Sequence, residues 1–215
     1  MGQFDPVVLA FTLAILALVP MAVVVTTTFL KLAVVMSLVR NALGIQQIPP
    51  NIALYSLALI LTLYIMAPVG DKMVDAFRSE PNATRNLESL ITAVQKGAEP
   101  LRGFLLKNSA TAQRDFFMRT AKRLWTEEMS RNVKQDDFLI LIPAFVVTEL
   151  TAAFQIGFLL YLPFVVIDLV ISNILLAMGM MMVSPVTISL PLKLFLFVLV
   201  DGWTRLIQGL VLSYV

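Results

Sequence analysis

Two charged residues in strongly apolar surroundings, Glu149 and Lys193, are the first candidates for chemistry in this chain. An ionisable side chain inside a membrane costs at least ~2.5–3.5 kcal/mol and normally has a partner of opposite charge. The two residues could face each other across one helical hairpin only if the chain turned midway between them, near residue 171. Gly179 and Pro185 instead place the turn later in the chain. We therefore expect a salt bridge across a subunit boundary. The alternative is that each side chain reaches water at a membrane interface.

Two carboxylates, Asp168 and Asp201, lie in the same apolar C-terminal region, where a proton relay is the usual suspicion. The chain has no histidine, and no second carboxylate accompanies either residue at helical spacing. We therefore favour structural hydrogen bonding or a helix-end position for both.

The absence of cysteine and histidine also removes the commonest zinc ligands, nucleophiles and general bases. No phosphate-binding glycine loop, nucleophile–base arrangement or metal-ligand spacing is present in the sequence. The sequence thus predicts that the protein is not an enzyme and that it has no metal and no cofactor.

Three consecutive methionines, Met180, Met181 and Met182, follow Gly179 and precede Pro185. Adjacent residues of a helix point about 100° apart, so one straight helix cannot direct all three side chains at the same surface. The run therefore predicts a helix end or a turn. Unbranched, polarizable thioethers gathered there would form a soft lining that can repack, and the alternative is ordinary filling of an apolar core.

The composition is that of a membrane protein, because 59% of the 215 residues are hydrophobic and only 14% are charged. The charges are segregated, with 22 of the 30 Asp, Glu, Lys and Arg residues in 70–137. In that segment 12 basic residues face 10 acidic ones, which argues against a nucleic-acid partner.

This pattern predicts an all-α protein in three segments. Residues 1–69 would form an N-terminal hydrophobic helical hairpin, 70–137 a polar and mostly helical middle segment, and 138–215 a set of C-terminal hydrophobic helices with a methionine-rich turn. Hydropathy gives about four transmembrane helices. Irregular backbone at membrane depth is tolerated only where protein covers it, so we expect many apolar faces to pack against other subunits.

In the first segment, the apolar stretch 7–39 is long enough to be a kinked or broken helix, and Pro20 is the expected kink. Residues 40–51 contain turn-forming residues, and a second apolar stretch, 52–69, is expected to end at Pro68.

In the middle segment, helices are expected between the breakers Pro81, Gly97 and Pro100. An apolar stripe at near-helical spacing predicts a helix face packed on the protein's own core, and the alternative is a binding site. The stripe consists of Phe116, Phe117, Leu124 and Trp125. A last short helix is expected over about 203–215.

Three long motifs resemble one protein family. The first runs from Arg40 to Asn51 and includes Asn41, Gly44, Pro49 and Pro50. The second runs from Pro143 to Phe158 and includes Glu149 and Gly157. The third runs from Pro163 to Trp203 and includes Asp168, the three methionines, Lys193 and Asp201. Together they cover nearly the whole chain. The chain resembles the FliP/SctR family of bacterial type III secretion export-apparatus proteins.

The resemblance implies a core subunit of the export gate, which forms part of the protein-conducting pore for unfolded secreted polypeptides. It implies a homo-oligomer, expected to be a pentamer, joined by partners of the FliQ/SctS and FliR/SctT families into a ring-shaped helical assembly. The location implied is the bacterial inner membrane, with the assembled complex raised toward the periplasm.

The resemblance also assigns residues. It implies that Met180, Met181 and Met182 form a pore gasket and that Glu149 and Lys193 form the inter-subunit salt bridge. The remaining motif residues would be structural, namely Arg40, Asn41, Gly44, Pro49, Pro50, Gly157, Asp168 and Asp201.

The N-terminus has no basic region ahead of its apolar run, so no cleaved signal peptide is expected. Flagellar members usually begin with one, so the resemblance favours the injectisome branch. Two other functions stay open: a small ion-coupled secondary transporter with Asp168 or Glu149 as its coupling carboxylate, and a membrane scaffold that tolerates polar residues in the methionine run.

Overall fold

The computed structural model describes residues 17–45, 47–79 and 87–215, and over these ranges its regular secondary structure is entirely helical. The predicted all-α class is therefore confirmed. The chain groups into two compact units. Unit 1 comprises Met1–Leu30 and Pro68–Val147, and unit 2 comprises Lys31–Ala67 and Thr148–Val215. The division into 1–69, 70–137 and 138–215 stays a prediction.

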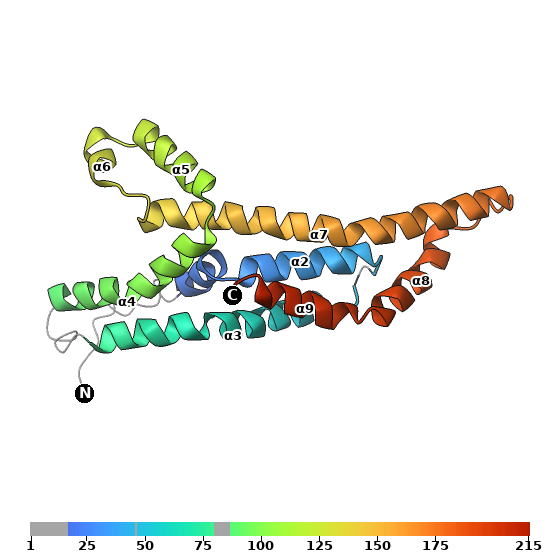
Figure 1. Ribbon diagram of the computed structural model, residues 1–215, viewed down its shortest axis with the longest axis horizontal. Helices are drawn as coiled ribbons and strands as arrows, with labels where there is room; N and C mark the ends of the chain where they lie inside the picture. The colour runs from blue at the N-terminus through green and yellow to red at the C-terminus, as the bar shows by residue number, and fades with distance from the viewer. Residues whose placement is uncertain (1–16, 46, 80–86) are drawn as a thin grey trace. The chain divides into compact units, whose positions relative to one another are not determined.

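The helices follow one another with short connections, and several continue from one unit into the other. In chain order they are Ala17–Thr26, α2 (Phe29–Ala42), α3 (Asn51–Arg78), α4 (Leu87–Asn108), α5 (Thr111–Leu124), α6 (Glu127–Asn132), α7 (Phe138–Ala177), α8 (Pro185–Leu199) and α9 (Gly202–Leu212) (Figure 1).

The first apolar stretch is broken at a different place from the one expected. Pro20 lies inside the helix Ala17–Thr26, and the break falls at Thr27 and Thr28. The Thr27 hydroxyl donates a hydrogen bond to the Val23 carbonyl oxygen at 2.6 Å. Such side-chain bonds compete with the main-chain bonds of a helix and bend it, so the threonine run, rather than the proline, interrupts the helix.

Prolines interrupt fewer helices than we expected. The second apolar stretch does not end at Pro68, because α3 continues through this residue to Arg78. Likewise α4 encloses Gly97 and Pro100, and α7 runs unbroken through its two prolines. A proline removes one main-chain hydrogen bond, which a long helix with neighbours on its flanks can sustain. The expected breaker Pro81 lies outside the described residues.

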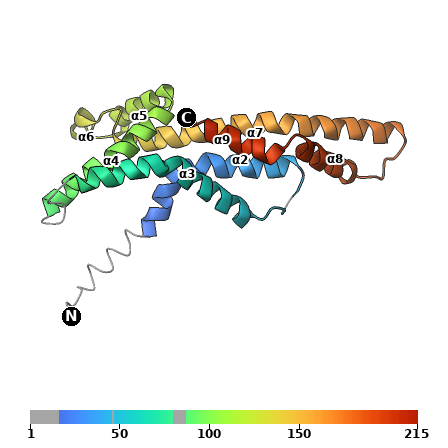
Figure 2. The same cartoon turned by 60° about the horizontal axis from the view of Figure 1, so that its bottom comes forward.

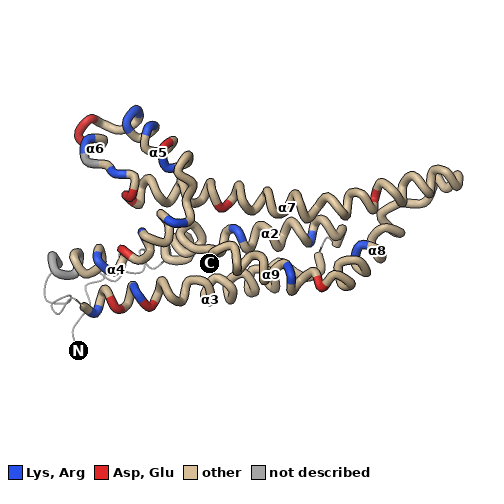
Figure 3. The backbone as a smooth tube through the Cα atoms, in the orientation of Figure 1, with Lys and Arg blue, Asp and Glu red and all other residues tan. Residues whose placement is uncertain are grey.

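The core of unit 1 forms where α4 packs against the first turns of α7. Leu105, Leu141 and Phe145 are fully buried there, and the Phe104 ring meets the Phe145 ring edge-on with centroids 5.7 Å apart. On α5, Ala121 is the one buried residue. Figure 3 shows most of the charged residues on the polar helices of this unit.

The predicted apolar stripe is packed only in part, because Phe117 and Trp125 are half-buried whereas Phe116 and Leu124 are exposed. Phe116 is 52% exposed and Leu124 is 75% exposed. Phe116 and Phe117 contact each other edge-to-face, with ring centroids 5.2 Å apart. The spacing identified an apolar helix face correctly, but not what covers it.

In unit 2, α2 lies along the part of α7 that follows Thr148 (Figures 1 and 2). Leu32, Val35 and Met36 of α2 are fully buried. Close approach of the two helices depends on Gly157, because a Cβ atom there would lie 2.3 Å from Cδ1 of Leu38. This close approach supports the structural role proposed for Gly157, which stays a prediction.

Two helices, α3 and α7, are long and apolar enough to span a membrane. Two further pairs of helices, each interrupted by a short break, pass the same test together, namely Ala17–Thr26 with α2 and α8 with α9. The described residues thus contain between two and four candidate spans, in agreement with the four that hydropathy indicated.

Candidate functional site

The methionine run lies in the loop between α7 and α8, where the predicted turn is confirmed. The N–H of Met180 donates to the carbonyl oxygen of Leu175 at 2.9 Å, and that of Gly179 donates to Leu176 at 3.0 Å. Gly179 has a φ of 74°. This pair of bonds around a left-handed glycine is a Schellman motif, which ends a helix. Pro185 then occupies the first turn of α8, a position that suits proline.

The side chains of this loop face away from the chain's own core. Met180 is 42% exposed, Met181 is 81% exposed and Met182 is fully exposed. The loop forms the free end of the α7–α8 hairpin (Figures 1 and 2). Filling of the protein's own core, the alternative interpretation, is therefore wrong for this run. Contiguous exposed apolar side chains are a mark of an interaction surface.

A partly buried ion pair joins α8 to α7 near this loop. The Lys193 ammonium contacts the Asp168 carboxylate at 2.6 Å, with the two side chains 7% and 37% exposed. The same ammonium lies 3.5 Å from the carbonyl oxygen of Ala42 at the end of α2. This pairing supports the structural role that we favoured for Asp168, which stays a prediction. Its pairing follows from the turn, since Asp168 and Lys193 lie almost equally far from it along the two helices.

Glu149 belongs to a second buried cluster that the sequence analysis missed. Its carboxylate lies 3.7 Å from the Lys31 ammonium and accepts a hydrogen bond from the Tyr214 hydroxyl. The Lys31 ammonium also lies over the Tyr214 ring, 4.2 Å from its centroid. All three residues are at least nine-tenths buried. This cluster ties the end of the chain to α2 and α7.

The chemistry of this cluster is that of a closed network rather than a reactive site. Burial, followed by the nearby negative charge of Glu149, raises the pKa of Tyr214 far above its ordinary value. The hydroxyl therefore stays protonated and remains a donor to Glu149. Lys31 could have been found in the sequence, since it is the one charged residue in a long apolar stretch and Glu149 was a carboxylate without a local partner.

Within one chain, Glu149 and Lys193 are not partners of each other, because each forms a different ion pair. The expected bridge between Glu149 of one copy and Lys193 of another stays a prediction.

The motif residues between α2 and α3 fix the loop that joins these helices. The Arg40 guanidinium donates to the carbonyl oxygen of Pro49 at 3.3 Å and to the side chain of the first residue of α3. Gly44 adopts a φ of 79°, and its N–H donates to the carbonyl oxygen of Asn41 at 3.0 Å. Pro50 accepts the first main-chain bonds of α3. These contacts support the structural role predicted for the motif, which stays a prediction.

Asp201 lies at the bend between α8 and α9, whose axes differ by 59°. It precedes α9 with a φ of 54°, in the left-handed region that residues other than glycine rarely occupy. Its carboxylate accepts a hydrogen bond from the Thr204 hydroxyl at 3.0 Å. The helix-end position expected for Asp201 is confirmed. Within the described ranges, no cluster of three or more acidic residues could hold a metal ion.

Comparison with known proteins matches the chain to one family over most of its length. The model of the FliP family covers residues 12–210. Yop proteins translocation protein R of Yersinia pestis is 55% identical over 210 residues, which are 98% of this chain and 97% of that protein. Harpin secretion protein HrcR of Erwinia amylovora is 49% identical over 99% of this chain and 98% of that protein. Virulence protein YscR of Salmonella typhimurium is 50% identical over 98% of this chain and 97% of that protein.

Proposed function

Because the chain belongs to the FliP family and is a component of the type III secretion export apparatus, we propose that it lines the protein-conducting pore of the export gate. The family predicted from the three motifs is confirmed, and so is the injectisome branch, since the similar proteins named above are translocation, harpin-secretion and virulence proteins. This membership favours an export component over a secondary transporter or a general scaffold.

The observation that carries the proposal is the exposed methionine loop at the end of the α7–α8 hairpin. Met181 and Met182 are 81% and 100% exposed, although methionine is an apolar residue that normally lies inside. Within the described ranges of a single chain, no residue covers them. If several copies surround one axis, their loops converge there and cover one another.

Methionine suits such a seal because it is unbranched and polarizable and so repacks easily. At rest, the converged side chains exclude water and ions. When an unfolded polypeptide passes, the same side chains yield and pack around whatever side chains it carries. The chain acts as a passive conduit, and we propose no catalytic step for it.

The proposed assembly is a pentamer of this chain joined by FliQ/SctS-like and FliR/SctT-like subunits at the bacterial inner membrane, raised toward the periplasm. Support comes from the large apolar side chains that one chain leaves exposed on α3, α7 and α8, among them Ile52 at 75%, Phe158 at 64% and Phe195 at 64%. Such extensive apolar surface requires either lipid or other subunits as cover.

The inter-subunit bridge fits this assembly only with an exchange of partners. Glu149 would leave Lys31, and Lys193 would leave Asp168, as one copy meets the next. We propose that the pairs seen in the single chain keep each charge compensated until that exchange, since an unpaired buried charge costs several kcal/mol.

The seal is tested by ion conductance of the assembled gate in a planar bilayer. Replacing Met180, Met181 and Met182 together with alanine should make the closed gate leak ions while native mass spectrometry still finds the complete assembly. Alanine at Met21 and Met129, which are 68% and 55% exposed elsewhere in the chain, is the matched control and should leave conductance at its resting level. An unchanged conductance in the triple variant would contradict the proposal.

A further inference from the structure

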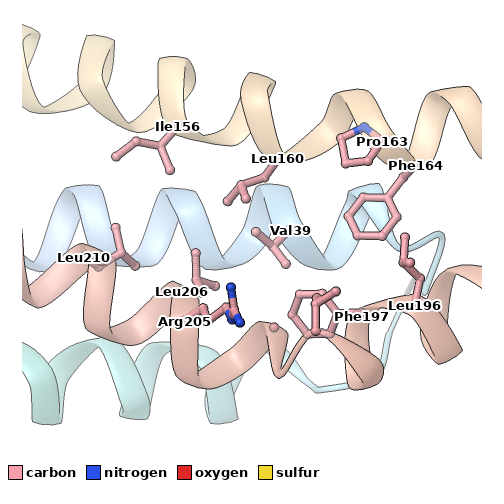
Figure 4. A pocket seen from close by; sticks show the side chains of 13 residues that line it. Val39, Ile156, Leu160, Pro163, Phe164, Leu196, Phe197, Arg205, Leu206 and Leu210 are labelled. Atoms are coloured by element: carbon pink, nitrogen blue, oxygen red, sulfur yellow. The ribbon is translucent and has the colours of Figure 1, made fainter.

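Unit 2 contains a cavity of about 500 Å³ that neither the methionine loop nor the buried ion pairs use. It lies between α2, α7 and the bend from α8 to α9. Apolar side chains from all of these helices line it, among them Val39, Leu160, Phe164, Phe197 and Leu206 (Figure 4).

Aromatic side chains that pack on one another form part of the cavity wall. Phe164 and Phe197 are 5% and 9% exposed, and their ring centroids lie 6.4 Å apart. The Phe197 ring also meets Trp203 edge-on, with centroids 5.5 Å apart. Gly202 permits this position, because a Cβ atom there would lie 2.4 Å from the Phe197 ring. The space is therefore a built feature of the fold.

One charged residue, Arg205 of α9, is among the residues that line the cavity. Its guanidinium extends among the apolar side chains (Figure 4). It forms no salt bridge or side-chain hydrogen bond within the part of the chain that the structure describes. Arg205 is exposed to solvent, so its charge lies where the apolar space opens to the surroundings. An exposed cation at the opening of an apolar space suits a ligand with an anionic group at one end and hydrocarbon at the other.

The size of the cavity decides which ligand this is. An α-helix with its side chains is about 10–12 Å across, so 500 Å³ would hold only about one turn of a partner helix. A hydrocarbon chain is much thinner and can lie along the cavity. Arginine is suited to bind phosphate, with which its guanidinium forms two parallel hydrogen bonds.

We propose that this cavity binds one acyl chain of an anionic phospholipid, whose phosphate-bearing headgroup contacts Arg205. The surrounding membrane supplies the lipid. The bound lipid completes the apolar packing between α2, α7 and α9 and neutralises the one charge at the site.

The chain offers its own probe for a test, because Trp203 lies next to the cavity wall and the only other tryptophan is Trp125 in unit 1. With Trp125→Phe as background, the full chain is reconstituted into phosphatidylcholine vesicles that contain a small fraction of lipid brominated on its acyl chains. Quenching of Trp203 fluorescence by brominated phosphatidylglycerol is compared with quenching by brominated phosphatidylcholine. A charge-assisted contact to the headgroup predicts binding of the anionic lipid about tenfold stronger.

Two variants assign the effect to the cavity. Gly209→Leu places a side chain into the space, where an added Cβ meets no atom within 4 Å, and should reduce phosphatidylglycerol quenching to the phosphatidylcholine level. Arg205→Gln should make the two lipids equal while hydrocarbon contact persists. The matched controls are Gly103→Leu, which is equally free of neighbours in α4, and Arg123→Gln. Both should keep the wild-type preference.

Equal quenching by the two lipids in the Trp125→Phe protein would overturn the proposal. So would a preference for phosphatidylglycerol that survives Gly209→Leu, since the anionic lipid would then bind elsewhere. Protection of Trp203 from both lipids that appears only in the assembled gate would show that another subunit fills the cavity, and would also overturn it.

Discussion

Replacing Lys31 with methionine should destabilise unit 2 strongly, because it leaves the Glu149 carboxylate without its cation. Lys31 and Glu149 are 5% and 3% exposed, and their charged atoms lie 3.7 Å apart. Methionine keeps the apolar part of the lysine side chain, so the change is mainly one of charge. Removing one member of a buried pair costs ~3–5 kcal/mol, a large share of the ~5–15 kcal/mol that stabilises a typical domain.

The chain has no cysteine, so a single thiol can report this loss. Ala153 of α7 is fully buried, and Ala153→Cys places a thiol that reacts with a maleimide only when unit 2 opens. In mild detergent, Lys31→Met should raise the labelling rate by roughly 150-fold to 5,000-fold. Arg131→Met, which breaks an exposed pair with Glu127, should change the rate by less than about fivefold.

A second substitution separates the charge effect from lost packing. Glu149→Gln still accepts the Tyr214 hydroxyl bond through its amide oxygen but carries no charge. The double variant Lys31→Met, Glu149→Gln should therefore label more slowly than Lys31→Met alone. If Lys31→Met labels at the wild-type rate, or if the double variant labels fastest of all, the buried pair does not support unit 2 as we reason.

Three further predictions concern the same unit, each measured by thermal unfolding in detergent. Gly157→Ala should lower the Tm, because the new Cβ would lie 3.1 Å from Cβ of Leu38 and overpacking costs ~1–3 kcal/mol; an unchanged Tm would mean that the helices separate freely. Asp168→Asn should cost ~1–3 kcal/mol, less than Lys31→Met, because the Asp168 side chain is 37% exposed; a larger loss than that of Lys31→Met would reverse our ranking of the two pairs. Asp201→Gly should leave the Tm unchanged or raise it by relieving ~1 kcal/mol of left-handed strain, whereas Asp201→Val should lower the Tm. A higher Tm for Asp201→Val than for Asp201→Gly would refute the backbone argument.

Local rules of helix termination were sufficient to predict the methionine turn. Gly179 supplies the left-handed residue and Pro185 the helix start, and both act within a few residues of the run. The same turn predicts that Asp168 and Lys193 face each other, a consequence that became evident only when the ends of both helices were known.

Long-range partners and helix continuity were harder to predict. Lys31 and Tyr214 meet Glu149 from far along the chain, and no local pattern says which distant residue an isolated charge will contact. Pro68 did not end α3, because the remaining main-chain bonds of this long helix outweigh the one that proline removes. Pro20 likewise lies within the helix Ala17–Thr26 without interrupting it. The apolar face of α5 was recognised, but spacing does not reveal whether the same chain or another covers it.

Cross-linking through the methionine loop tests the central claim most directly. In the cysteine-free chain, Met182→Cys places a fully exposed thiol at the end of the α7–α8 hairpin. If loops from several copies converge in the closed gate, mild oxidation of the assembled complex should join copies by disulfides in high yield, while Leu63→Cys on an exposed face of α3 should not be joined. Abundant cross-links at Leu63→Cys with none at Met182→Cys would show that the methionine loops lie apart, and would contradict the proposed seal.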